Sequence, residues 1–133
     1  MKDVLFGLAG ILILSVTGAN AQARMSDVTD KTFNARVLQS PKPVLVVFWA
    51  NWCGPCRILL SAANQVSPAM AARVTMVRVD VDQNSGASTI FGINSLPTVV
   101  IFKNGRLASR MPGGAANAQD WKQRLEQFIA SGS

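Results

Sequence analysis

The sequence predicts an α/β fold with a central mixed β-sheet and helices on both faces. Residues 44–50 (VLVVFWA) form an apolar run without alternation, rich in β-branched and aromatic residues, which is typical of a parallel strand buried on both faces. An Asn-Gly pair at Asn104 and Gly105 indicates an antiparallel hairpin near the end of the chain. The expected order of strand, helix, strand, helix, strand, strand and helix produces such a sheet.

Local signals predict the elements of the first half in order. Residues 29–32 (TDKT) supply cap residues, and the apolar positions of 33–38 fit one face of a short helix that ends at 40–43 (SPKP). After the central strand, 56–72 is rich in Ala, Leu and Met and lacks glycine. We expect a helix there, broken or ended near Ser67 because proline follows at position 68.

The second half continues the alternation. Residues 74–81 predict a strand, 82–86 a turn, and the segment through Phe91 a short helix. Pro97 opens a strand over 98–102, which the Asn-Gly turn connects to an antiparallel strand over 107–110. The last predicted helix covers 117–130, and its apolar residues share one face: Trp121, Leu125, Phe128 and Ile129.

Composition excludes several classes of function. The 133 residues suffice for one domain, and 49% apolar with 15% charged residues excludes a disordered polar chain. The chain has 2 Cys and no His or Tyr, which excludes Ser-His-Asp and Cys-His catalysis and His-ligated metal sites. The formal charge is +6, but the arginines are scattered and not interleaved with aromatics, so we expect no nucleic-acid binding.

The amino-terminal residues predict a secretory signal peptide over 1–23. Residues 4–16 are uncharged and apolar but too short to span a bilayer, Lys2 precedes them, and small residues follow at 19–23. Two A-x-A sites place cleavage after Ala21 or Ala23 and leave 24–133 as the working domain. We therefore expect an exported protein, periplasmic or secreted; the alternative is an uncleaved membrane anchor.

The candidate chemistry lies in Cys53-Gly54-Pro55-Cys56. Such a pair serves as half a zinc site, a local crosslink or a redox pair. A closed zinc site needs four ligands, which this chain lacks, and a crosslink over so short a loop restricts little chain entropy. At a strand-to-helix junction, free N–H groups and the helix dipole favour a thiolate. We therefore expect Cys53 to be the exposed nucleophile of a redox pair and Cys56 to be shielded.

Residues 48–56 (FWANWCGPC) resemble the active-site segment of the thioredoxin family. The likeness continues through 79–84, 92–98 and 102–105, and so covers most of the chain from about Val28 to Ile129. It implies a thioredoxin fold and no cofactor beyond the Cys53–Cys56 disulfide. The site residues it implies are Cys53 and Cys56 as the catalytic pair, Trp49, Trp52, Gly54 and Pro55 around them, a cis-proline at Pro97 opposite the cysteines, and Leu96 offering its backbone to a bound peptide.

The resemblance implies thiol–disulfide exchange. Cys53 attacks a substrate disulfide, and Cys56 then displaces the reduced substrate. The leading prediction is an exported monomeric protein-disulfide reductase that acts on disulfide-containing proteins and draws electrons from a membrane donor. The alternatives are a thiol oxidase or disulfide isomerase in the same compartment, or a non-catalytic binding module that uses the surface around Trp52 and Pro97.

Three positions depart from the family pattern. Val47 stands where thioredoxins usually carry a buried Asp, Arg78 where they carry its Lys partner, and Ser61 where a Pro commonly kinks the helix. Without a carboxylate at position 47 the base for Cys56 is unidentified, and water or Asp82 is considered. An alkyl group there, with Arg78 nearby, should lower the Cys53 pKa and make the potential more oxidising than about −270 mV. Ser61 predicts a straighter helix.

Overall fold

The computed structural model describes residues 25–111 and 114–132. The predicted signal peptide and its two cleavage sites lie outside the described residues. None of the helices within those ranges has the length and apolar character needed to cross a membrane.

The elements are β1 (Ser26–Asp27), α2 (Asp30–Phe33), the π-helix η1 (Asn34–Leu38), β2 (Val44–Trp49), α3 (Gly54–Ala63), α4 (Pro68–Ala71), β3 (Thr75–Asp80), α5 (Ser85–Ile90), β4 (Thr98–Lys103), β5 (Arg106–Met111) and α6 (Ala118–Gly132).

The five strands form one mixed sheet in the order β1-β3-β2-β4-β5. The central strand β2 pairs in parallel with β3 and antiparallel with β4, and β4 pairs antiparallel with β5. The predicted fold class and the buried central strand are therefore confirmed. Because β1, β2 and β3 are parallel, their carboxyl ends share one edge of the sheet, and the two cysteines follow β2 at that edge.

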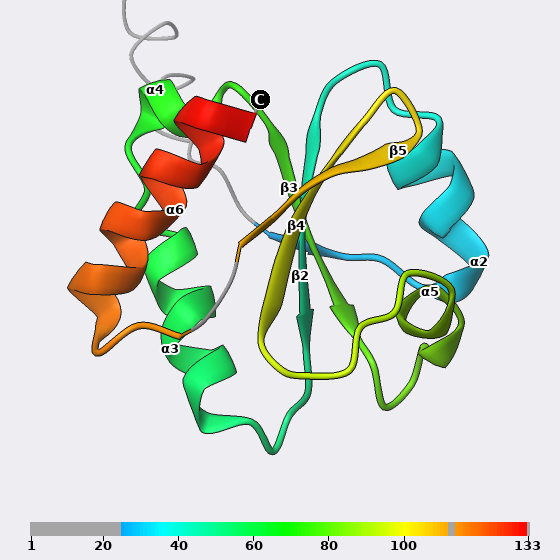
Figure 1. Cartoon of the computed structure of the whole chain (residues 1–133), viewed down its shortest axis with the longest axis horizontal. Helices are drawn as coiled ribbons and strands as arrows, with labels where there is room; N and C mark the ends of the chain where they lie inside the picture. Colours follow the sequence, from blue (N-terminus) through cyan, green and yellow to red (C-terminus); the bar gives the residue numbers. More distant parts are fainter. Residues whose placement is uncertain (1–24, 112–113, 133) are drawn as a thin grey trace, which may run out of the picture.

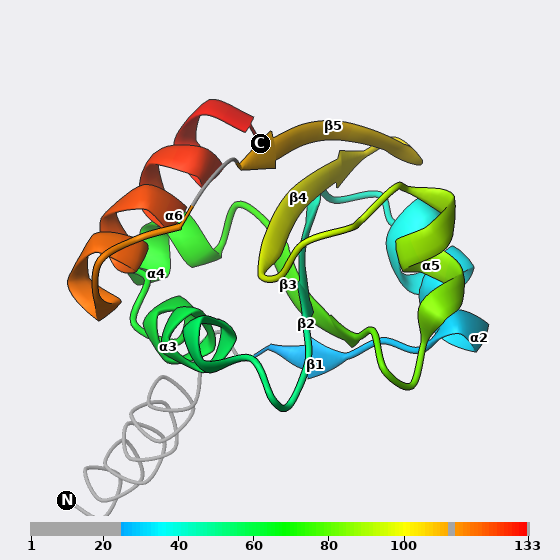
Figure 2. The same cartoon turned by 60° about the horizontal axis from the view of Figure 1, so that its bottom comes forward.

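Helices cover both faces of the sheet (Figures 1 and 2), with α3, α4 and α6 on one face and α2 and α5 on the other. The side chains of β2 alternate between the two layers, as a pleated strand requires. Leu45 and Val47 pack into the core under α3 and α6. Val44, Val46 and Phe48 pack into the core on the opposite face.

The hairpin between β4 and β5 turns at the predicted Asn-Gly pair. Asn104 has φ of 53° and Gly105 has φ of 79°, the left-handed values that a two-residue hairpin turn requires. A Cβ on Gly105 would also lie 3.0 Å from the carbonyl oxygen of Leu38. Both the positive φ and the close approach of the Leu38 carbonyl oxygen therefore favour glycine at position 105.

The helix after the cysteines differs from its prediction. It begins at Gly54 and ends at Ala63, before the expected limit near Ser67, and it runs without interruption through Ser61. A second short helix, α4, then begins at Pro68, whose missing N–H is tolerated in a first helical turn. The proline thus opens a helix of its own. The strands β3, β4 and β5 and the helix α6 lie where predicted. The short helix predicted before residues 40–43 is present as α2 and η1, although its π form was not predicted, and neither was β1.

Candidate active site

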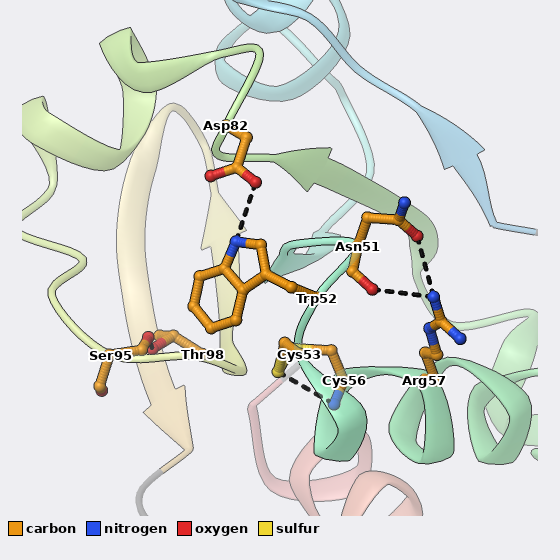
Figure 3. Close-up of a disulfide and its surroundings, with 8 residues drawn as sticks. All are labelled: Asn51, Trp52, Cys53, Cys56, Arg57, Asp82, Ser95 and Thr98. Atoms are coloured by element: carbon orange, nitrogen blue, oxygen red, sulfur yellow. Dashed lines mark hydrogen bonds between the residues drawn. A yellow bond between two sulfur atoms is a disulfide. The ribbon is translucent and has the colours of Figure 1, made fainter.

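Cys53 and Cys56 lie at the junction between β2 and α3 and are joined by a disulfide (Figure 3). Their sulfur atoms are 2.13 Å apart and their Cα atoms 5.3 Å apart. Cys56 is 0% exposed, as expected, but Cys53 is only 5% exposed. The prediction of an exposed Cys53 is therefore wrong for the disulfide form, because Cys53 packs with Cys56 and Ala50 in one buried cluster.

Cys53 is the N-cap of α3. Its backbone is extended, with φ of −87° and ψ of 105°, and its Sγ accepts a hydrogen bond from the backbone N–H of Cys56 at 3.2 Å. Pro55 stands in the first turn, where its missing N–H costs nothing. The predicted position of Cys53 at a helix N-terminus is confirmed. Both the N–H group and the helix dipole favour negative charge on this sulfur.

The surroundings of the disulfide are apolar. Trp49, Val81 and Leu96 pack against the cluster of Ala50, Cys53 and Cys56. The Leu96–Pro97 peptide bond is cis, as the family resemblance implied. Leu96 thus comes from a loop distant in sequence, before β4, and reaches the cysteines. Thr98 donates a hydrogen bond from its hydroxyl to the carbonyl oxygen of Ser95 at 2.6 Å, which fixes the turn around this proline.

Trp52 is the exposed aromatic side chain next to Cys53. It is 72% exposed, and its indole Nε1 donates a hydrogen bond to Oδ2 of Asp82 at 2.9 Å (Figure 3). The backbone N–H of Asp82 donates in turn to Oδ1 of Asp80 at 3.0 Å. Asp82, considered from the sequence as the base for Cys56, therefore has one carboxylate oxygen bound to an indole. We assign it to the orientation of Trp52.

Arg57 clamps the loop that precedes Cys53, a contact that the sequence reasoning missed. Its Nη2 donates to the backbone carbonyl oxygen of Asn51 at 2.9 Å and to its side-chain Oδ1 at 3.1 Å (Figure 3). An Asn and an Arg on either side of the cysteine pair were the available signal. The clamp fixes the loop between β2 and α3 and places a positive charge one residue after Cys56.

Val47 is 0% exposed and belongs to the core under α3 and α6. In the sheet it pairs with Arg78 of β3. The Arg78 guanidinium lies 5.0 Å above the ring of Trp49, and its Nε lies 2.7 Å from Oδ1 of Asp27 on β1. The expected cation is therefore held in an ion pair. Asp27 was missed because it lies 51 positions from Arg78 in the sequence.

The site provides sulfur chemistry and no metal centre within the part of the chain that the structure describes. There, no group of three or more Cys, Asp or Glu side chains is placed to hold a metal ion. The two sulfurs are bonded to each other, and a disulfide sulfur is not the thiolate that zinc binds. The Cys53–Cys56 pair can open and close one disulfide. The fold and the site of this chain therefore define a dithiol–disulfide oxidoreductase.

Comparison with known proteins agrees. The family model described as Thioredoxin matches residues 24–130. A thioredoxin of Rickettsia bellii is 45% identical over 80 residues, which are 60% of this chain and 76% of the relative. Thioredoxin 1 of a Nostoc species is 38% identical over 104 residues, 78% of this chain and 96% of the relative. A thioredoxin of Griffithsia pacifica is 42% identical over 89 residues, 67% and 82% of the two chains.

The chain belongs to the thioredoxin family. With its close cysteine pair it is a protein-disulfide reductase. The dithiol of the chain itself carries the electrons, so the reaction needs no separate cofactor.

Proposed function

We propose that the protein is an exported reductase of protein disulfides in which Cys53 attacks and Cys56 resolves. The Cys53 thiolate attacks one sulfur of a substrate disulfide; the substrate S–S bond breaks, and the released thiolate takes a proton from solvent. The Cys56 thiolate then attacks Cys53 Sγ in the mixed disulfide and releases the second substrate thiolate. Two electrons and two protons pass to the substrate, and the Cys53–Cys56 disulfide forms.

The different surroundings of the two sulfurs support Cys53 as the attacking residue and Cys56 as the resolving residue. Cys53 Sγ caps α3 and accepts the N–H of Cys56, whereas Cys56 is fully buried one helical turn further on. A helix N-terminus stabilises a thiolate, and the thiolate is the attacking species. The first attack therefore belongs to Cys53.

Exposed residues around the sulfurs supply a surface for an extended peptide. Trp52, Gly54 and Pro55 are exposed next to the cysteines in sequence, and Leu96 and Pro97 are half-buried, with Leu96 packed against the cysteine cluster. A cis-proline has no N–H to donate, so the backbone groups of Leu96 are the partners offered to a substrate chain. We infer that a substrate disulfide binds between Trp52 and Leu96.

Reduction of insulin by the wild type and by Cys53→Ser and Cys56→Ser variants tests the assignment. We expect both variants to lose turnover. Cys56→Ser should still attack and accumulate a mixed disulfide with substrate, whereas Cys53→Ser should not. Mixed-disulfide trapping by Cys53→Ser would reverse the two roles, and partner binding by a variant without either cysteine would favour a binding module.

The proposal of export rests on the amino-terminal sequence. An exported protein needs a membrane electron donor, because cytosolic reductants cannot reach it. Mass spectrometry of the protein recovered from the cell exterior or periplasm should find a chain beginning at Gln22 or Arg24. Thiol trapping in cells should find the cysteines mostly reduced, and loss of the membrane donor should oxidise them. An intact chain in the cytosolic fraction would contradict export.

Val47 favours a second candidate, a thiol oxidase or isomerase in the same compartment. A buried carboxylate near the sulfurs would disfavour a thiolate, and an alkyl side chain removes that repulsion. A stabilised thiolate stabilises the reduced form and makes the couple more oxidising than the thioredoxin value of about −270 mV. Titration against glutathione measures the potential, and a value at or below that of thioredoxin would remove this candidate.

A further inference from the structure

We propose that Asp27, on the edge strand β1, is a positioning residue for the active site, because it holds the Arg78 guanidinium on Trp49 and balances the charge of that guanidinium. Trp49 is the ring that packs against the cysteine cluster. The proposal rests on the function proposed above only in taking Cys53 as the reactive thiol. It connects a two-residue strand at the border of the sheet (Figure 2) with the chemistry at its centre.

Arg78 lies next to Val47 in the sheet and finds its partner on β1. Its neighbour on β2 is Val47, and an alkyl side chain offers a guanidinium no acceptor. Arg78 instead bonds Asp27 through Nε at 2.7 Å. The two side chains are 32% and 68% exposed, so the pair is partly solvated. Such a pair contributes little to folding stability. It nevertheless fixes the position of the guanidinium, and its two charges cancel.

The Arg78 guanidinium also contacts the ring of Trp49. The guanidinium lies 5.0 Å from the centre of the Trp49 ring, within the range of a cation–π contact. The Nε1 atom of Trp49 is buried and has no hydrogen-bond partner among the described residues. Packing and stacking therefore hold this ring in place. Trp49 packs in turn against the cluster that contains Cys53 and Cys56.

These contacts run from Asp27 through Arg78 and Trp49 to the disulfide. Asp27, Arg78 and Trp49 also line one pocket of about 300 Å³, together with Asp80. Other charged side chains on the elements around the cysteines are Arg57, which binds Asn51, and Asp82, which binds Trp52. The carboxylate of Asp80, at the end of β3, accepts the backbone N–H of Asp82 and is unchanged in every variant below. The charges of Asp27 and Arg78 cancel. Loss of the Asp27 carboxylate leaves one positive charge, and loss of the Arg78 guanidinium leaves one negative charge.

The charge balance predicts opposite effects for the two single variants. Asp27→Asn leaves Arg78 uncompensated and should favour the Cys53 thiolate. Arg78→Gln leaves the Asp27 carboxylate uncompensated and should disfavour it. We expect apparent pKa shifts of about 0.4 unit, downward and upward respectively, as for a unit charge one aromatic ring away at a partly exposed site. The double variant restores neutrality and should return close to wild type.

The experiment is alkylation of the reduced full chain by iodoacetamide across pH, with mass spectrometry to separate Cys53 from Cys56. Arg36→Gln is the matched control. Arg36 is also a cation bound to β1, donating to the carbonyl oxygen of Asp27 at 3.0 Å and to Ser26 Oγ at 2.6 Å, but the Trp49 ring is stacked by Arg78. We expect no shift in this control. In 1 M NaCl the shifts of the two single variants should shrink, because salt screens the uncompensated charge that each variant leaves.

A merely structural role would move both single variants in the same direction, with the double variant at least as far from wild type, and that result would overturn the proposal. Equal shifts in Arg36→Gln and Asp27→Asn would do the same. If Arg78→Gln does not fold, the direction of the Asp27→Asn shift and its reduction in 1 M NaCl still decide, and an upward or salt-independent shift would overturn the proposal. The readout is thiol reactivity, so it is independent of insulin reduction, whose failure would count against the proposed function alone.

Discussion

The two faces of the sheet are built from alternate residues of the same strand and have different tasks. On the face covered by α2 and α5, Phe33, Phe91 and Phe102 form a closed aromatic group with ring centroids 4.9 to 5.8 Å apart. On the face covered by α3 and α6, the core ends in Trp49, next to the disulfide. The first face supplies packing, whereas the second uses its packing to orient a reactive pair. Substitutions should separate these tasks.

The largest expected effect is loss of activity without loss of fold. Cys53→Ala removes the proposed nucleophile, and insulin reduction should fall to the uncatalysed background. Because the buried cluster around it is small and the disulfide closes a very short loop, thermal unfolding of the variant should stay close to that of the reduced wild type. A large drop in Tm relative to that reference would show that the reactive face also carries the stability.

The aromatic face should show the reverse result. Phe102 is 1% exposed and stacks edge-on against both other rings. Phe102→Ala should lower the free energy of unfolding by about 3–5 kcal/mol, the usual cost of a large cavity. Denaturant unfolding measures this loss. At a temperature where the variant is folded, the pH dependence of Cys53 alkylation should match wild type, and a changed profile would contradict the separation of tasks.

Val47→Asp places the two tasks in conflict at one residue. Burial raises the pKa of the new carboxyl, so its folded pKa lies above its unfolded value of about 3.9 and stability falls as pH rises through that range. We expect a cost of about 1–3 kcal/mol near neutral pH and less near pH 4. Denaturant unfolding at both values measures it.

The same variant should turn over faster if deprotonation of Cys56 limits the reaction, because it supplies a nearby base. Val47→Asn is the matched control, since the asparagine side chain has nearly the same shape as aspartate but cannot ionise. An equal rate in the wild type and both variants would show that proton transfer at Cys56 is not limiting.

The smallest effect concerns the rim of the site. Asp82→Ala removes the acceptor of the Trp52 indole and frees an exposed ring. We expect a few-fold rise in KM for insulin with kcat nearly unchanged, corresponding to roughly 1 kcal/mol for one charged-acceptor hydrogen bond at an exposed position. Steady-state kinetics would detect it. A fall in kcat at constant KM would instead place Asp82 in the chemical step.

The sequence predicted most of this architecture because its signals are local. A buried strand, an Asn-Gly turn and an apolar helix face each lie within a few residues, and the cysteine pair lies within one helical turn. β1 could not be predicted, since two residues carry no periodicity and the strand exists through pairing with β3. The end of α3 at Ala63 was missed because the nearest strong helix-ending signal, Pro68, lies further along the chain and instead begins α4.

The candidate site divides in the same way. The cysteines, Trp52 and Pro97 could be identified from a contiguous resemblance. The pairing of Asp27 with Arg78 could not, because it depends on the neighbouring positions of β1 and β3 in the sheet and on a valine that leaves the guanidinium without an acceptor.

The borders of the sheet have a consequence for association between molecules. An edge strand with free backbone groups is a template for another chain. Here one border is β1, with only two residues. The other is β5, whose outward positions include the exposed Arg106 and Arg110. The short length of β1 and the cationic side chains of β5 therefore disfavour pairing of either edge with a strand of another molecule. We expect the folded chain to resist fibril formation at concentrations where unprotected sheets aggregate.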